Sequence, residues 1–150
     1  MAPTASPPDP RAQCALCRDD GGALVARAPR LRVVLVDDPD YPAYLRVIWN
    51  EHVTEMSDLA RPQRAHLLAA VDAAEAALRQ IVAPDKINLA SLGNQVPHLH
   101  WHVIARFVDD AHFPNPIWGA RQRDPDPALL ARCRQRLPAL RARIAELLVE

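Results

Sequence analysis

The segment Pro97–Ile104 constrains this chain more than any other, because histidine stands at every second position along most of it. In an extended strand, successive side chains point to opposite faces, so His98, His100 and His102 line one face of a sheet. The apolar residues around them seat the strand on the opposite face or at its continuation: Leu99, Trp101, Val103 and Ile104. Half of the six histidines in the chain are therefore directed at one place. Folding alone does not require this, and the pattern predicts a functional site.

Two kinds of functional site fit three histidines on one face: a metal cluster, and a histidine nucleophile with helper residues. At about 3.3 Å per residue, His98 and His102 lie roughly 13 Å apart along the strand. Each zinc-binding nitrogen must lie about 2 Å from the ion, so neighbouring pairs can bind a metal, but all three need a bulge. A nucleophile at His100, with His102 beside a bound anion, needs no distortion, and imidazole is largely unprotonated at neutral pH. Buried, hydrogen-bonded structural histidines are the remaining alternative.

The length of 150 residues is that of a single domain, and it is sufficient for a hydrophobic core. Its 18 basic and 18 acidic residues give a formal net charge of zero, so no overall field attracts a nucleic acid polymer. We find no run of about 18 apolar residues and no basic-then-apolar leader, and therefore expect a cytoplasmic protein without a membrane span. Frequent proline predicts a flexible tail over residues 1–13, followed by one domain over residues 14–150.

Five strands and two long helices are predicted from the apolar spacing and the turn signals. We expect strands at residues 23–26, 31–36, 44–49, 86–91 and 98–107. Apolar residues three and four apart predict helices over residues 62–82 and 126–148. Pro138 should kink or split the second helix. The strands cluster around one helix without β-α-β alternation, which favours an α+β fold with an antiparallel sheet.

Cys14 and Cys17 are separated by two residues, a spacing that is typical of metal or redox sites. In a chain without an export signal, these roles are favoured over a structural disulfide. A cysteine pair supplies only two of the four ligands of a tetrahedral zinc ion, so two more must come from elsewhere. The alternative is a pair of buried apolar cysteines. Cys133 lies on the apolar stripe of the last helix, and we expect it in the core.

The segment His98–Ile104 resembles the His-φ-His-φ-His-φ-φ signature of the histidine triad superfamily of nucleotide hydrolases and transferases, where φ is an apolar residue. The similarity extends upstream through Ile87–Pro97, includes Val47–Val53, and covers roughly residues 14–118. It implies a five-stranded antiparallel sheet with a central helix and a C-terminal helix, usually in a homodimer. For this dimer we expect contacts through helix 62–82 or the strand beside it, with the last helix as the competing candidate.

In that superfamily the middle histidine attacks the α-phosphate of a nucleotide and forms a nucleotidyl-histidine intermediate, and its position here is His100. We expect His102 to stabilise the phosphate, and His98 to orient its neighbours or bind zinc. The resemblance implies a nucleotide hydrolase or nucleotidyl transferase that needs no catalytic metal. Diadenosine polyphosphates are the preferred substrates, and nucleoside phosphoramidates or sugar nucleotides are alternatives. The competing hypothesis is a nucleotide-binding interaction protein with little turnover.

Four residues are candidates for substrate binding. Asn94 and Gln95 lead into the triad and offer N–H donors to phosphate oxygens. Many family members have glutamine at the position of Asn94 and serine or threonine at that of Gln95, so this chain departs at both. Asn88 resembles a phosphate-binding asparagine, and Asp37 stands where the family binds the ribose hydroxyls. The alternative for all four is local bonding to the backbone in turns and at strand ends.

The resemblance also suggests the missing zinc ligands. Some branches of the superfamily, such as the galactose-1-phosphate uridylyltransferase type, complete a zinc site with an upstream histidine and the first triad histidine. The matching positions are His52 and His98, so the expected structural zinc site consists of Cys14, Cys17, His52 and His98. The loop at residues 109–119 is rich in proline and aromatic residues and is expected to border a substrate pocket, cap the core or fill a dimer contact.

Overall fold

The structure is a computed structural model that describes residues 7–148. A five-stranded antiparallel sheet forms its centre, with the strand order β1-β2-β3-β5-β4. The strands are β1 (Ala23–Arg27), β2 (Leu31–Leu35), β3 (Tyr44–Trp49), β4 (Lys86–Ala90) and β5 (His100–Arg106). Two long helices accompany them: α3 (Arg61–Ile81) and α4 (Pro127–Leu147). The short helices are α1 (Pro10–Gln13), α2 (Ala15–Arg18) and η1 (Met56–Asp58). The predicted α+β fold and antiparallel sheet are confirmed.

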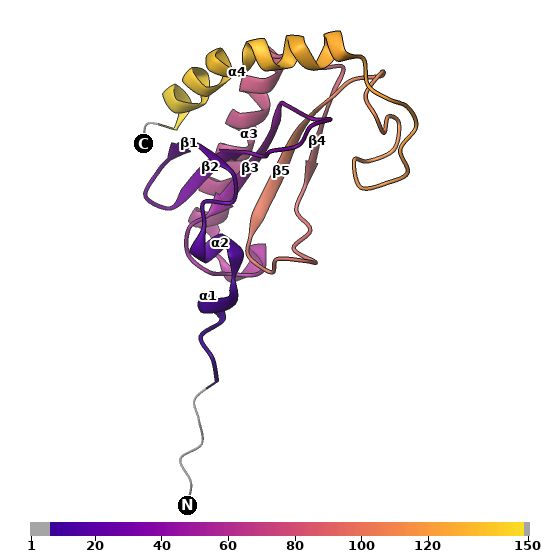
Figure 1. Ribbon diagram of the computed structural model, residues 1–150. Coiled ribbons are helices and arrows are strands. Elements are labelled where there is room, and N and C mark those ends of the chain that lie inside the picture. Colours follow the sequence, from indigo (N-terminus) through magenta and orange to yellow (C-terminus); the bar gives the residue numbers. More distant parts are fainter. Residues whose placement is uncertain (1–6, 149–150) are drawn as a thin grey trace, which may run out of the picture.

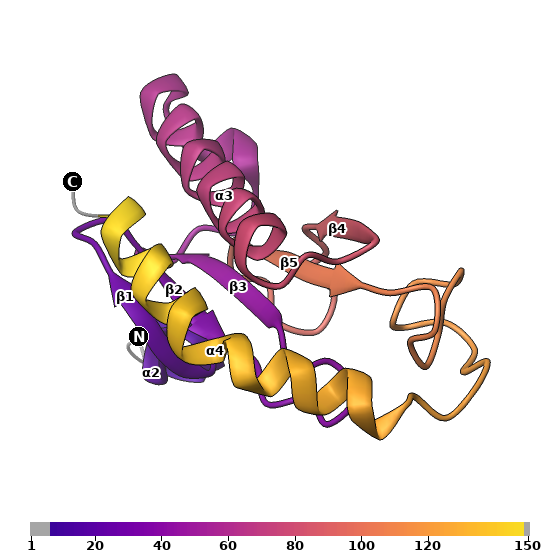
Figure 2. The same cartoon turned by 90° about the horizontal axis from the view of Figure 1, so that it is seen from above.

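One face of the sheet carries the hydrophobic core. Helices α3 and α4 cover this face, and Figures 1 and 2 show them on the same side of the strands. Residues such as Val47, Val103 and Leu78 are fully buried between the layers. Each Å² of apolar surface that is removed from water contributes about 25 cal/mol of free energy. This contact between the sheet and the helices is therefore the main stabilising term of the fold. No helix in residues 7–148 is long and apolar enough to cross a membrane.

The other face of the sheet carries the polar and histidine side chains. In the register of β3 with β5, Ile48 pairs with His100, and Arg46 pairs with His102. Because side chains alternate along a strand, these residues share one face. Ile104 also lies on this side, in a small buried cluster with Tyr41 and Tyr44, so it does not help to seat the strand on the core.

The N-terminal helices lie against this second face. Cys14 and Leu16 pack on Val34 of β2 and Ile48 of β3, which places α2 over the middle of the sheet. Residues 1–6 of the predicted tail lie outside the described residues, and α1 is a single helical turn capped by Asp9.

Two local sequence signals fix the start of α4. The Asp126 side chain accepts a hydrogen bond from the backbone N–H of Ala128, and Pro127 occupies the first turn, where its missing N–H costs nothing. Pro138 lies inside the helix, which continues through it without being split. The axis of α4 changes direction part-way along its length (Figures 1 and 2).

A buried ion pair fastens the loop that follows β5. Arg106 donates from Nε to Asp110 at 2.7 Å, and both side chains are only 2% exposed. Its other N–H groups bond the side chain of Asn88 and the carbonyl of Asn115, and Tyr41 donates to Asp110. Burial raises the pKa of the Asp110 carboxyl, but hydrogen bonds from Arg106 and from backbone amides outweigh it, so this pKa lies below its usual value.

Removing this carboxylate is therefore expected to cost much of the stability of the fold. In Asp110→Ala, the buried guanidinium of Arg106 loses its counter-ion, and the free energy of unfolding should fall by about 3–5 kcal/mol. Denaturant unfolding measures the change. The exposed neighbour provides a matched control, since Asp109→Ala should stay within about 0.5 kcal/mol of the parent. Equal effects of the two substitutions would contradict this role of the ion pair.

Candidate active site and metal centre

His100 and His102 border a cavity of about 350 Å³ on the second face of the sheet. Strand β5 places them there because they are two residues apart and therefore point the same way. The cavity is lined by residues from α2, β3, β5, the loop after β4 and the loop after β5: Leu16, Arg46, Leu92, Gly93, Asn94, Gln95, Val96, His100, His102 and Trp118.

The hydrogen bond of His100 fixes its tautomer. Its Nδ1 lies 2.6 Å from the backbone carbonyl oxygen of His98. Because a carbonyl only accepts, Nδ1 carries the ring proton, and Nε2 is left with a lone pair. Burial lowers the pKa of His100 below its usual value, outweighing this hydrogen bond, and the positive charge of Arg46 acts in the same direction. His100 is therefore a neutral imidazole with a nucleophilic nitrogen at neutral pH.

His102 is neutral as well, but its surroundings differ. Burial, together with the nearby His100 and Arg46, lowers its pKa to about 3. Its Nδ1 lies 2.6 Å from the hydroxyl of Tyr44, whose own pKa is raised by burial, so that the phenol keeps its proton. When Tyr44 donates this proton to Nδ1, the ring proton of His102 stands on Nε2 and is available as a donor. The indole of Trp118 lies edge-on to His102, with ring centroids 5.0 Å apart.

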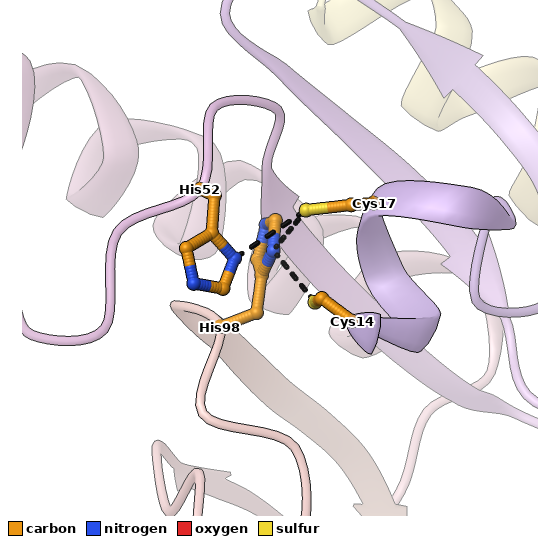
Figure 3. Close-up of side chains that lie close together, drawn as sticks. All are labelled: Cys14, Cys17, His52 and His98. Carbon is orange, nitrogen blue, oxygen red and sulfur yellow. Dashed lines mark hydrogen bonds between the residues drawn. The ribbon is translucent and has the colours of Figure 1, made fainter. Parts of the chain in front are cut away.

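Four possible metal ligands meet next to the histidine cavity. Figure 3 shows Cys14, Cys17, His52 and His98 directed toward one another, and their ligand atoms all lie within 4.8 Å of one another. Nδ1 of His98 lies 3.4 Å from each of the two sulfurs, and Nδ1 of His52 lies 3.4 Å from that of Cys17. Two sulfurs and two nitrogens in this arrangement are the donor set that tetrahedral zinc prefers.

The surroundings of the cluster support metal binding by His98. Its Nε2 lies 2.6 Å from the carbonyl oxygen of Trp49 and must carry the ring proton, so Nδ1 turns its lone pair toward the sulfurs. The guanidinium of Arg32, which is 4% exposed, donates to the carbonyl oxygens of Leu16 and Asp20 and so holds the backbone on both sides of Cys17. The four side chains are therefore positioned for a cation without a large rearrangement.

The structure separates the three triad histidines. His98 precedes β5 and turns to the cysteines, whereas His100 and His102 face the cavity. Asn94 and Gln95 also line the cavity. Asn88 accepts a hydrogen bond from Arg106 at 2.6 Å, and the exposed Asp37 follows β2. Neither of the last two is among the lining residues, and their contacts with substrate stay predictions.

Three further residues of the site were not singled out from the sequence. Tyr44 and Arg46 alternate with core residues along β3, and a polar face on a strand that is otherwise buried was an available signal. Trp118 belongs to the predicted loop at residues 109–119, but only the structure places it beside His102. The same loop is held by the Asp110 carboxylate, which accepts hydrogen bonds from Arg106 and from the backbone N–H of Phe113. The loop therefore borders the cavity and also covers buried polar groups.

Comparison with known protein families matches residues 21–109 to the HIT domain. An AP-4-A phosphorylase of Mycobacterium tuberculosis is 30% identical over 124 residues, which are 79% of this chain and 64% of that protein. This chain therefore spans slightly less than two thirds of the length of that relative.

Solved structures give the same fold. A histidine triad protein from Bradyrhizobium japonicum has 32% identity and a TM-score of 0.63, over 78% of this chain and 91% of that one. One from Sinorhizobium meliloti has 28% identity and a TM-score of 0.67, over 86% and 91%. A zinc-bound histidine triad protein from Mycobacterium smegmatis has 20% identity and a TM-score of 0.61, over 91% and 96%.

The pKa directions predict that both cavity histidines stay neutral in mildly acidic solution. A histidine in a short peptide titrates near pH 6.5, with about half of its rings protonated there. The His102 ring should still be neutral at this pH, and the titration midpoint of His100 should lie below it, so that less than half of the His100 rings are protonated at pH 6.5. An NMR titration, assigned with His100→Gln and His102→Gln, measures this. A midpoint at or above pH 6.5 for His100 would contradict the proposed environment.

Proposed function

The chain belongs to the HIT domain family, and we propose on this basis that it transfers a nucleotidyl group through a covalent bond to His100. Nε2 of His100 attacks the α-phosphorus of a nucleotide, forms a P–N bond, and displaces the leaving group with the electron pair of the broken P–O bond. An acceptor oxygen then attacks the same phosphorus. The P–N bond breaks, its electrons return to Nε2, and the proton of the acceptor passes to solvent.

The single observation that carries this proposal is the fixed tautomer of His100. The hydrogen bond from Nδ1 to the carbonyl of His98 leaves the lone pair on the nitrogen next to the cavity, and burial keeps the ring unprotonated. His102 has the complementary role, because a proton on its Nε2 can be donated to a phosphate oxygen. The side-chain amides of Asn94 and Gln95 supply further neutral donors from the cavity wall.

For the substrate we propose a dinucleoside polyphosphate, as in the name of the AP-4-A phosphorylase relative. Attack on one α-phosphate of diadenosine tetraphosphate releases ATP and leaves AMP on His100. Water as the acceptor then gives AMP, whereas orthophosphate gives ADP. We expect water to be the acceptor, which makes the reaction a hydrolysis. Because the relative is named a phosphorylase, orthophosphate is tested as the second acceptor. Product analysis with and without phosphate distinguishes the two acceptors.

The first test of the function is the removal of the nucleophile. His100→Ala should abolish labelling of the protein by a substrate with a radioactive α-phosphate, and lower turnover at least about a thousandfold. Nucleotide binding, measured by calorimetry, should persist, because only the attacking nitrogen is lost. The exposed His66 on α3 provides the control, and His66→Ala should keep both label and turnover.

Two outcomes would contradict the proposal. Turnover of His100→Ala within a few-fold of the parent would exclude this nucleophile. Tight nucleotide binding by the parent protein without label or products would instead identify a nucleotide-binding interaction protein.

We further propose that Cys14, Cys17, His52 and His98 hold a structural zinc ion. The S₂N₂ donor set and the orientation of His98 support it, and a zinc-bound protein of the same fold is known. When bound, the ion supplies a rigid anchor for the segment that leads into β5. The carbonyl of the same His98 accepts the hydrogen bond of His100, so this anchor also helps to keep the nucleophile in place.

The zinc proposal predicts about one zinc ion per chain in protein purified without a histidine tag. Cys14→Ser should lower the zinc content to near zero and reduce thermal stability, because the binding energy of a structural metal is also folding energy. Cys133 lies in α4 outside the cluster, so Cys133→Ser should keep the zinc. A metal-free protein with full activity and stability would make the cysteine pair ordinary core packing, and reversible loss of activity with a chelator would favour a metal-dependent hydrolase.

A homodimer also remains part of our proposal. Exposed leucines lie on α3, on the edge strand β4 and just after it, namely Leu68, Leu89 and Leu92. These elements correspond to the helix predicted over residues 62–82 and the strand beside it, which we expect at the dimer contact. Burying their apolar surface in a second copy would remove it from water.

A further inference from the structure

Arg46 places a positive charge in the histidine cavity. It lies on β3, directly opposite His102 of β5, and its half-buried side chain lines the same cavity. Of the ten residues that line this cavity in the described chain, Arg46 alone carries a permanent charge. The other polar groups of the wall are neutral amides and neutral imidazoles.

The charge of Arg46 has no counter-ion within residues 7–148. No carboxylate of these residues lies within 4.0 Å of its guanidinium nitrogens. One Nη donates to the carbonyl oxygen of Gly21 at 3.1 Å, which holds the side chain in place, and the buried Nε has no hydrogen-bond partner in the described structure. Arginines with buried polar atoms are normally paired, because an unpaired charge away from water is costly. The arrangement therefore points to an anionic ligand.

We propose that Arg46 binds a phosphate group of the substrate next to the one that His100 attacks, and so selects polyphosphate substrates. This inference rests on the proposed function. The strand register supports this assignment, because His100 pairs with Ile48, and Arg46 lies two residues before Ile48 on β3, opposite His102. His102 and the amides of Asn94 and Gln95 already supply neutral donors for the attacked phosphate. A guanidinium adds a full charge and a fork of N–H groups that matches phosphate oxygens.

This assignment predicts discrimination by substrate charge. Diadenosine tetraphosphate carries several anionic phosphates, whereas adenosine 5′-phosphoramidate offers only the attacked one. Both substrates form the same adenylyl-His100 intermediate under the proposed function. Loss of the guanidinium should therefore harm the tetraphosphate selectively.

The experiment compares kcat/KM for the two substrates in the parent protein and in Arg46→Gln. The substitution should lower the value for the tetraphosphate by about 10- to 100-fold, the range expected for charged hydrogen bonds. The value for the phosphoramidate should fall less than about threefold. Arg46→Lys keeps the charge without the fork and should lose less on the tetraphosphate than Arg46→Gln. Arg136 is exposed on α4, and Arg136→Gln is the matched control with the same change of charge.

Binding of inorganic tripolyphosphate tests the same claim without turnover. In calorimetry, the parent and Arg136→Gln should bind it, and Arg46→Gln should bind it about 10- to 100-fold more weakly. Equal losses on both substrates, or unchanged tripolyphosphate binding in folded Arg46→Gln, would overturn the assignment. If the parent turns over neither substrate, the proposed function fails, and the tripolyphosphate measurement still decides the role of Arg46. Should Arg46→Gln fail to fold, Arg46→Lys provides both comparisons.

Discussion

The hydrogen bond between Nδ1 of His100 and the backbone carbonyl of His98 is the contact on which the candidate site depends. It assigns the ring proton of His100 and so determines which nitrogen can attack. The same His98 directs its side chain to Cys14 and Cys17 and fixes its own ring through the carbonyl of Trp49. One residue therefore links the candidate metal centre to His100, the proposed nucleophile. Anything that moves the segment before β5 alters both.

Two neighbouring histidines acquire different chemistry from different partners. The carbonyl oxygen of His98 can only accept a hydrogen bond, so Nδ1 of His100 carries the ring proton and Nε2 keeps its lone pair next to the cavity. A buried phenol beside His102 keeps its proton and can donate it, so it favours a ring proton on the side of the cavity. Burial and the charge of Arg46 hold both rings neutral. The proposed nucleophile and the proposed phosphate donor thus lie 4.9 Å apart between ring centroids.

The sequence predicted the parts of this arrangement that follow from local spacing. Alternation placed His100 and His102 on one face, and both lie on that face of β5 in the structure. The resemblance to the histidine triad superfamily brought together Cys14, Cys17, His52 and His98, and these lie together in the structure. Local spacing could not predict contacts between residues that are far apart in the sequence. Arg46 faces His102 only through the register of β3 with β5, and Trp118 reaches it only through a loop held by Arg106 and Asp110.

Under the proposed function, the nucleotidyl group passes through His100 in two displacements at the α-phosphorus. Each in-line displacement inverts the configuration of the phosphorus, so two of them restore it. The most direct measurement uses diadenosine tetraphosphate made chiral at the α-phosphorus by one sulfur atom. It is turned over in ¹⁸O-labelled water, and the adenosine thiophosphate product is analysed by ³¹P NMR. Two displacements through His100 predict overall retention of configuration. Inversion would show direct attack by water and would contradict a covalent intermediate on His100.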